Sequence, residues 1–193
     1  VCGCSVGAIN AAALASHASN FPDAVVRLER LWRQLSCNSI YQTDLRSLLG
    51  AAWRWISTLA LCGLGKGDPG PLLNNQPLSR LLEREYDRAG LCEALEGGAL
   101  DALCISTSNY ADGVSVSFFE SAVRREGWGR ARRIGRPARI EVAHLMASSA
   151  LPFVFSPVRL DGAYHGDGAL RLTTPFSPAI RLGAERIVVI GGR

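Results

Sequence analysis

The stretch "VCGCSVGAINAAALASHA", residues 1–18, decides the fold. Residues 3–7 form a G-x-S-x-G pattern centred on Ser5, and an alanine-rich run without a helix breaker follows it. Alanine is the strongest helix former, so this run predicts a helix over residues 8–18. An apolar start, a glycine-flanked serine and a helix together predict a nucleophile elbow. In such an elbow a tight turn between a strand and a helix exposes the serine hydroxyl.

A serine hydroxyl attacks an ester only when a base takes its proton and a polar site stabilises the oxyanion. The glycines of the turn allow close backbone approach, and the helix directs its first N–H groups toward the serine. The residues that complete the motif around Ser5 are Gly3, Cys4, Val6 and Gly7. The same sequence also fits an inert serine at a glycine-rich helix start, so the question turns on the base.

The base is either a histidine or a carboxylate. The chain has three histidines, and the α/β-hydrolase order of Ser, Asp and then His would need one after the acidic residue. No histidine follows Asp167. A Ser-His-Asp triad would therefore need a histidine beyond residue 193, or would need His165, which lies two residues from Asp167 on the same strand face.

A Ser–Asp dyad is the other option, with Asp167 in direct contact with the serine. Asp167 follows a predicted strand, and Gly168 and Ala169 come next in the motif "GDGA". Glycine neighbours allow tight turns and close approach. An aspartate in such a turn can also simply bind its own backbone, and that alternative stays open here.

Strands and helices alternate along the rest of the chain, which predicts an α/β fold. Predicted helices cover residues 22–35, 77–87 and 141–150. Residues 101–107 and 114–120 are predicted strands, and two shorter strand pieces flank Asp161-Gly162. The β-branched run "RIVVIG", residues 186–191, is typical of a strand that is buried on both faces.

Length and composition fit one globular domain. The chain has 193 residues, 48% of them hydrophobic, and we expect a single domain over residues 1–193 that is truncated at both ends. The formal net charge is +4, and the densest basic run, residues 124–139, holds a single aromatic residue. A solvated loop explains this run better than a nucleic-acid interface, so no nucleic-acid partner is expected. The six cysteines lack zinc-site spacing, so no zinc site is expected.

Residues 50–64, "GAAWRWISTLALCGL", are nearly all apolar but too few to span a bilayer. This run predicts either a core helix or a lid that touches a membrane surface. The expected location is accordingly the cytoplasm or the membrane periphery.

Four stretches resemble the patatin-like phospholipases, and they span most of the chain. "GCSVGAINA" is similar to the elbow and helix of the family, and "MASSALPFVFSPVRLDG" to the segment before its catalytic aspartate. "HGDGALRLTTPFSPAIRLGAERIVVIG" resembles the D-G-[GA] motif with the helix and strand after it. "NNQPLSRLLEREYD" resembles the P-L-x-x-L-L helix of bacterial members.

The resemblance implies a three-layer α/β/α fold with a mostly parallel central sheet. It implies that Ser5 is the nucleophile and Asp167 the base of a dyad that needs no histidine, cofactor or metal. The implied reaction is hydrolysis of a phospholipid or another lipid ester through an acyl-enzyme. The glycine-rich oxyanion loop of the family would lie before Val1. A non-catalytic lipid-binding or scaffold domain of the same fold, and a triad esterase, are the alternatives.

Overall fold

The computed structural model describes residues 1–35, 73–172 and 176–191. Its helices are α1 (Val6–Ser16), α2 (Phe21–Gln34), α5 (Gln76–Glu85), α6 (Arg88–Glu96), α7 (Val142–Ser148) and α8 (Phe176–Arg181), with the 3-10 turns η1 (Ala18–Asn20) and η2 (Gly168–Leu170). Its strands are β1 (Cys2–Cys4), β2 (Ala102–Asn109), β3 (Ser115–Ser121), β4 (Trp128–Arg130), β5 (Arg133–Pro137), β6 (Val158–Leu160) and β7 (Ala163–Asp167). The apolar run 50–64, expected as a core helix or lid, lies outside the described residues.

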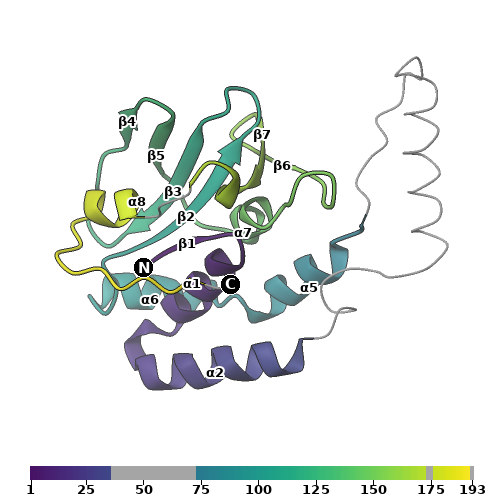
Figure 1. Cartoon of the computed structure of the whole chain (residues 1–193). Coiled ribbons are helices and arrows are strands. Elements are labelled where there is room, and N and C mark those ends of the chain that lie inside the picture. The colour runs from purple at the N-terminus through teal and green to yellow at the C-terminus, as the bar shows by residue number, and fades with distance from the viewer. Residues whose placement is uncertain (36–72, 173–175, 192–193) are drawn as a thin grey trace, which may run out of the picture.

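The strands form one seven-stranded sheet in the order β4-β5-β3-β2-β7-β6, and β1 also pairs with β2 (Figure 1). Only β1–β2 and β3–β5 are parallel pairs among these strands. The pairs β2–β3, β2–β7, β4–β5 and β6–β7 are antiparallel. The prediction of a mostly parallel sheet was therefore wrong. Short turns link β2 to β3 and β6 to β7. A short turn reverses the direction of the chain, so the strands on either side of it pair in antiparallel fashion.

The predicted strand over residues 186–191 was also wrong. This segment pairs with no strand of the described chain, and the side chains of Val188 and Ile190 are 88% and 93% exposed. β-Branched residues favour a strand only where a neighbouring strand and a packed face receive them. Among the described residues, residues 186–191 have neither a neighbouring strand nor a packed face.

Strand β2 is the centre of the molecule, and all of its residues are buried. Leu103 and Ile105 point to one face, where they pack in a core formed with helices α1, α5, α6 and α7. Ala102 and Cys104 point to the other face and pack near Leu182, directly after α8. Helices thus cover both faces of the sheet, and the α/β fold class is confirmed.

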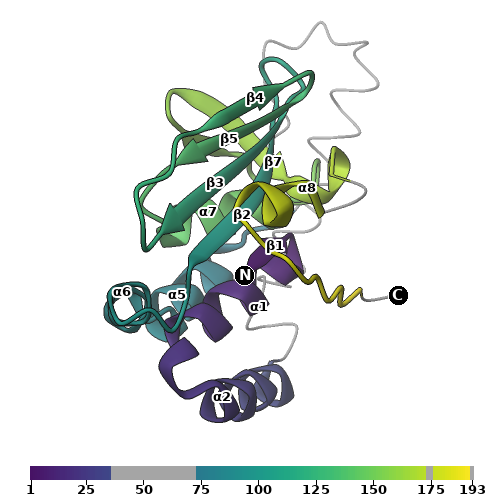
Figure 2. The ribbon, with the colours of Figure 1, turned by 90° about the vertical axis from the view of Figure 1, so that its left-hand side faces the viewer.

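Helix α1 lies directly against the sheet, with α2 on its outer side (Figure 2). The four alanines that α1 turns inward are at most 3% exposed: Ala8, Ala11, Ala12 and Ala15. Such small side chains let the helix approach β1 closely. The helix predicted over residues 8–18 is confirmed as α1, which begins immediately after Ser5. None of the described helices has both the length and the apolar character needed to cross a membrane.

Candidate active site

The carboxyl ends of β1 and β7 meet on the central strand. Strand β1 runs parallel to β2 and places Cys4 opposite Ser106. Strand β7 runs antiparallel along the same edge and places Asp167 opposite Thr107. The two strands therefore end at neighbouring residues of β2 while approaching from opposite directions. This brings together Asp167 and Ser5, which are 162 positions apart in the sequence.

Ser5 occupies a strained turn between β1 and α1. Its backbone φ of 54° and ψ of −128° lie where residues other than glycine are rare. Such a conformation costs on the order of 1–3 kcal/mol and persists only where the surroundings hold it. Ser5 is the N-cap residue of α1, yet its hydroxyl does not cap the helix. The hydroxyl instead donates a 2.6 Å hydrogen bond to Oδ2 of Asp167.

Asp167 is fixed by its own network and is only 1% exposed. Its Oδ1 accepts a 2.8 Å hydrogen bond from the Ala169 N–H. Its main-chain N–H donates to the Ala150 carbonyl at 2.9 Å, and its carbonyl accepts from Ser108 Oγ at 2.8 Å. One carboxylate oxygen is thus held by the backbone, and the other faces Ser5.

The glycines of the G-x-S-x-G motif and of the G-D-G-A motif differ in how much space surrounds them. A Cβ at Gly3 would lie 2.3 Å from the Gly7 carbonyl oxygen, and one at Gly168 would lie 2.1 Å from the Ser106 carbonyl oxygen. At Gly7 a Cβ would meet no atom within 4 Å. Close packing of β1 on α1, and of η2 on β2, therefore requires glycine at Gly3 and Gly168 but not at Gly7.

A protein-family model described as patatin-like phospholipase matches residues 1–180. The chain belongs to the patatin-like phospholipase family. Members of this family are generally lipid acyl hydrolases, and the family acts on lipid substrates. A search of curated proteins found no match to the chain.

Two serines of this patatin-like domain hold the strained turn from the side of α7. Ser148 Oγ accepts a 2.9 Å hydrogen bond from the Ser5 N–H and donates one of 2.7 Å to the Ser106 carbonyl. Ser149 Oγ donates to the Ser5 carbonyl at 3.3 Å. No role for these two serines was predicted from the sequence. The only sign of them in the sequence is the adjacent serine pair in "MASSALPF". Their hydrogen-bond partners, Ser5 and Ser106, are distant in sequence, so only the fold identifies them.

Replacing Ser148 with alanine is expected to lower the free energy of unfolding by about 1–3 kcal/mol, because two buried backbone groups lose their partner. Ser149→Ala is the matched control, since it removes a single, longer hydrogen bond and should cost less. Urea denaturation of the two variants measures both values. A cost for Ser149→Ala equal to that for Ser148→Ala would contradict this account of the turn.

None of the three histidines of the patatin-like domain is hydrogen-bonded to Ser5 or Asp167. Their Nδ1 atoms pair instead with the Ala13 carbonyl (His17, 3.3 Å), the Glu141 N–H (His144, 3.1 Å) and Thr107 Oγ1 (His165, 2.9 Å). His165 is completely buried, and this burial lowers its pKa. The described structure thus places a carboxylate, and no imidazole, beside the serine.

Cys4 lies next to the Ser5 turn but is poorly suited to act as a nucleophile. The described cysteines are free thiols, and no group of three or more His, Cys, Asp or Glu side chains among the described residues could hold a metal ion. Burial, and secondarily the negative charge of Asp167, raises the pKa of the Cys4 thiol to about 12. Because the thiolate is the reactive form, this raised pKa disfavours a nucleophilic role for Cys4 at neutral pH.

This arrangement predicts how Cys4 responds to alkylation. Iodoacetamide at about pH 8 should modify Cys4 slowly, since nearly all of the thiol is protonated. Asp167→Asn removes the neighbouring negative charge, which favours the thiolate, so the pKa of Cys4 should fall and its alkylation rate should rise. Peptide mass spectrometry measures the rate at this position. Equal rates in the wild type and the variant would show that the Asp167 charge does not act on Cys4.

Proposed function

We propose that the protein hydrolyses carboxylic esters of lipids, with Ser5 as the nucleophile and Asp167 as its general base. The observation that carries this proposal is the 2.6 Å hydrogen bond from Ser5 Oγ to Asp167 Oδ2 at a strained strand-to-helix turn. Membership of the patatin-like phospholipase family supports lipid esters as the substrate class.

In the acylation half of the reaction, Asp167 accepts the proton of the Ser5 hydroxyl while Oγ attacks the ester carbonyl carbon. The resulting tetrahedral intermediate collapses as the bond to the alcohol oxygen breaks. Asp167 returns the proton to that oxygen, the alcohol leaves, and the acyl group remains on Ser5.

In the deacylation half, Asp167 takes a proton from a water molecule, whose oxygen attacks the acyl carbonyl carbon. The bond between that carbon and Ser5 Oγ then breaks, and Oγ recovers the proton from Asp167. A fatty acid is released, and both side chains return to their starting states. The buried and hydrogen-bonded position of Asp167 suits this role, because the carboxylate needs no rearrangement between the two halves.

Oxyanion stabilisation in this proposal comes in part from the start of α1. The first N–H groups of a helix have no partner within the helix, and the helix dipole makes that end positive. Val6 directly follows the nucleophile and begins α1. Its backbone N–H is the candidate donor, because the N–H after the nucleophile serves this purpose in a nucleophile elbow.

Fluorophosphonate labelling tests the proposal directly. The wild-type protein should be labelled at Ser5, as located by peptide mass spectrometry, and Ser5→Ala should abolish the label. Absence of label on the wild type, together with absence of ester hydrolysis, would overturn the proposal and favour a non-catalytic lipid-binding domain. A label that depends on a histidine would instead favour a triad esterase.

A further inference from the structure

Two free thiols are paired across β1 and β2, just before the Ser5 turn. Cys2 lies opposite Cys104 in the register of these parallel strands. The Cys104 N–H donates a 2.9 Å hydrogen bond to the Val1 carbonyl, so the backbone holds the two strands together at this point. Cys104 is part of the apolar cluster on the α8 side of the sheet, and Cys2 packs against that cluster. The fold thus places side by side two cysteines that are far apart in the sequence.

The pairing gives these cysteines the backbone separation of a disulfide. Paired residues of neighbouring strands direct their side chains to the same face of the sheet. Neighbouring strands lie about 4.8 Å apart, which is within the roughly 4.4–6.8 Å between Cα atoms that a disulfide spans. Cys4 is on the same face of β1, but its register partner is Ser106, which has no thiol. Cys2 and Cys104 are therefore the pair that the register favours.

The two thiols differ in exposure and acidity. Cys2 is partly exposed, whereas Cys104 is completely buried. A side-chain hydrogen bond with Cys104 lowers the pKa of the Cys2 thiol, and the same bond, together with burial, raises the pKa of the Cys104 thiol. The thiolate is the nucleophile in thiol–disulfide exchange. Cys2 is thus suited to attack a reagent that arrives from solvent, and Cys104 is suited to react second.

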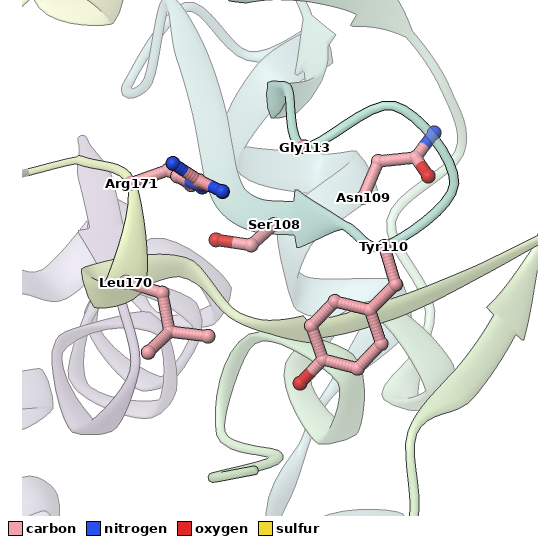
Figure 3. Close-up of a pocket in the computed structure, with 6 residues that line it drawn as sticks. All are labelled: Ser108, Asn109, Tyr110, Gly113, Leu170 and Arg171. Carbon is pink, nitrogen blue, oxygen red and sulfur yellow. The ribbon is translucent and has the colours of Figure 1, made fainter.

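The same face of β2 ends at a pocket of about 270 Å³ (Figure 3). Side chains alternate along a strand, so Cys104 and Ser108 share this face. The pocket is lined by Ser108, Asn109, Tyr110, Gly113, Leu170 and Arg171. None of these lining residues is a cysteine. The paired thiols therefore lie apart from the pocket, at the end of β2 that pairs with β1.

We propose that Cys2 and Cys104 form a reversible disulfide when the protein is exposed to a small-molecule disulfide such as oxidised glutathione. The Cys2 thiolate attacks one sulfur of oxidised glutathione, the S–S bond of that molecule breaks, and one glutathione leaves. Cys104 then loses its proton and attacks the Cys2 sulfur of the mixed disulfide, and the second glutathione leaves. The two cysteines together lose two electrons and two protons. Oxidised glutathione gains both and becomes two thiols.

This disulfide fastens β1, which leads into the Ser5 turn, to the central strand of the sheet. It closes a loop of about 100 residues, and a cross-link over such a loop restricts the unfolded chain. The Tm of the oxidised protein should therefore exceed that of the reduced protein by roughly 5–15 °C. The cross-link forms whether or not Ser5 is a nucleophile, so its absence would leave the proposed function standing.

The test treats the wild-type protein with oxidised glutathione and digests it with trypsin in the absence of a reductant. Mass spectrometry should detect a cross-link between the peptide of residues 1–27 and the peptide of residues 89–124. Dithiothreitol should reverse both the cross-link and the rise in Tm. Equal Tm values before and after complete cross-linking would contradict the proposal that the bond fastens β1 to β2.

Each of the two peptides holds two cysteines, so variants assign the bond. The cross-link should remain in the control variants Cys4→Ser and Cys92→Ser and be absent from Cys2→Ala and Cys104→Ala. Cys2→Ala is the decisive variant, because Cys2 is partly exposed and its loss disturbs the core less than that of Cys104. Three outcomes overturn the proposal: a cross-link that persists in Cys2→Ala, a glutathione adduct that stays on Cys2 of the wild type, or a wild type in which both thiols stay reduced.

Discussion

Replacing Asp167 with asparagine is expected to reduce kcat for ester hydrolysis by roughly 10²–10⁴-fold, which is the range that a general base contributes. The substitution keeps the size of the side chain and an oxygen for the 2.8 Å hydrogen bond from the Ala169 N–H. It removes the negative oxygen that accepts the 2.6 Å hydrogen bond from Ser5 Oγ. Steady-state kinetics on p-nitrophenyl hexanoate and on a short-chain phospholipid measure the loss.

The control for this experiment is substitution of the two histidines that lie near the sheet. His144→Gln and His165→Gln change imidazoles whose hydrogen bonds go to Glu141 and Thr107 instead of the dyad, so both variants should retain ester hydrolysis. His165 is completely buried, so its variant is compared at a temperature well below its own unfolding midpoint. Retention of activity in Asp167→Asn, or its loss in both folded histidine variants, would show that the base is not Asp167.

Replacing Gly3 with alanine is expected to lower the free energy of unfolding by about 1–3 kcal/mol or more, as overpacking does. The added methyl group would lie 2.3 Å from the Gly7 carbonyl oxygen, 2.6 Å from Ala8 Cα and 2.7 Å from Ala11 Cβ. Two of these atoms belong to the backbone, so β1 and α1 must separate to admit the methyl group. For a domain of this size such a cost lowers Tm by roughly 2–12 °C.

The second glycine of the same motif provides the control. Gly7→Ala places its methyl group in open space and lies in the first turn of α1, where alanine is the better helix former by up to about 1 kcal/mol. We therefore expect Gly7→Ala to leave Tm unchanged or to raise it. Thermal unfolding followed by circular dichroism measures both variants. Equal destabilisation at the two positions would mean that close packing of β1 on α1 is not the reason for glycine at Gly3.

Local sequence was enough to predict the elements around the proposed nucleophile. The alanine-rich run predicted α1, and the Asp-Gly turns predicted where the chain reverses before β3 and β7. These features depend on side-chain propensity and turn chemistry, which act over a few residues. Strand direction and the role of residues 186–191 were mispredicted. Both depend on which strands lie next to each other, and propensity alone does not fix that choice.

The sequence by itself determined the helix after Ser5, the aspartate motif at Asp167 and, through the four matching stretches, the family to which the chain belongs. Only the tertiary structure decided that β1 and β7 end at neighbouring residues of β2, which places the two side chains 2.6 Å apart. It also decided that Ser148 and Ser149 support the turn. The physical reason is that hydrogen bonds and steric contacts between distant residues exist only once the sheet has set its register.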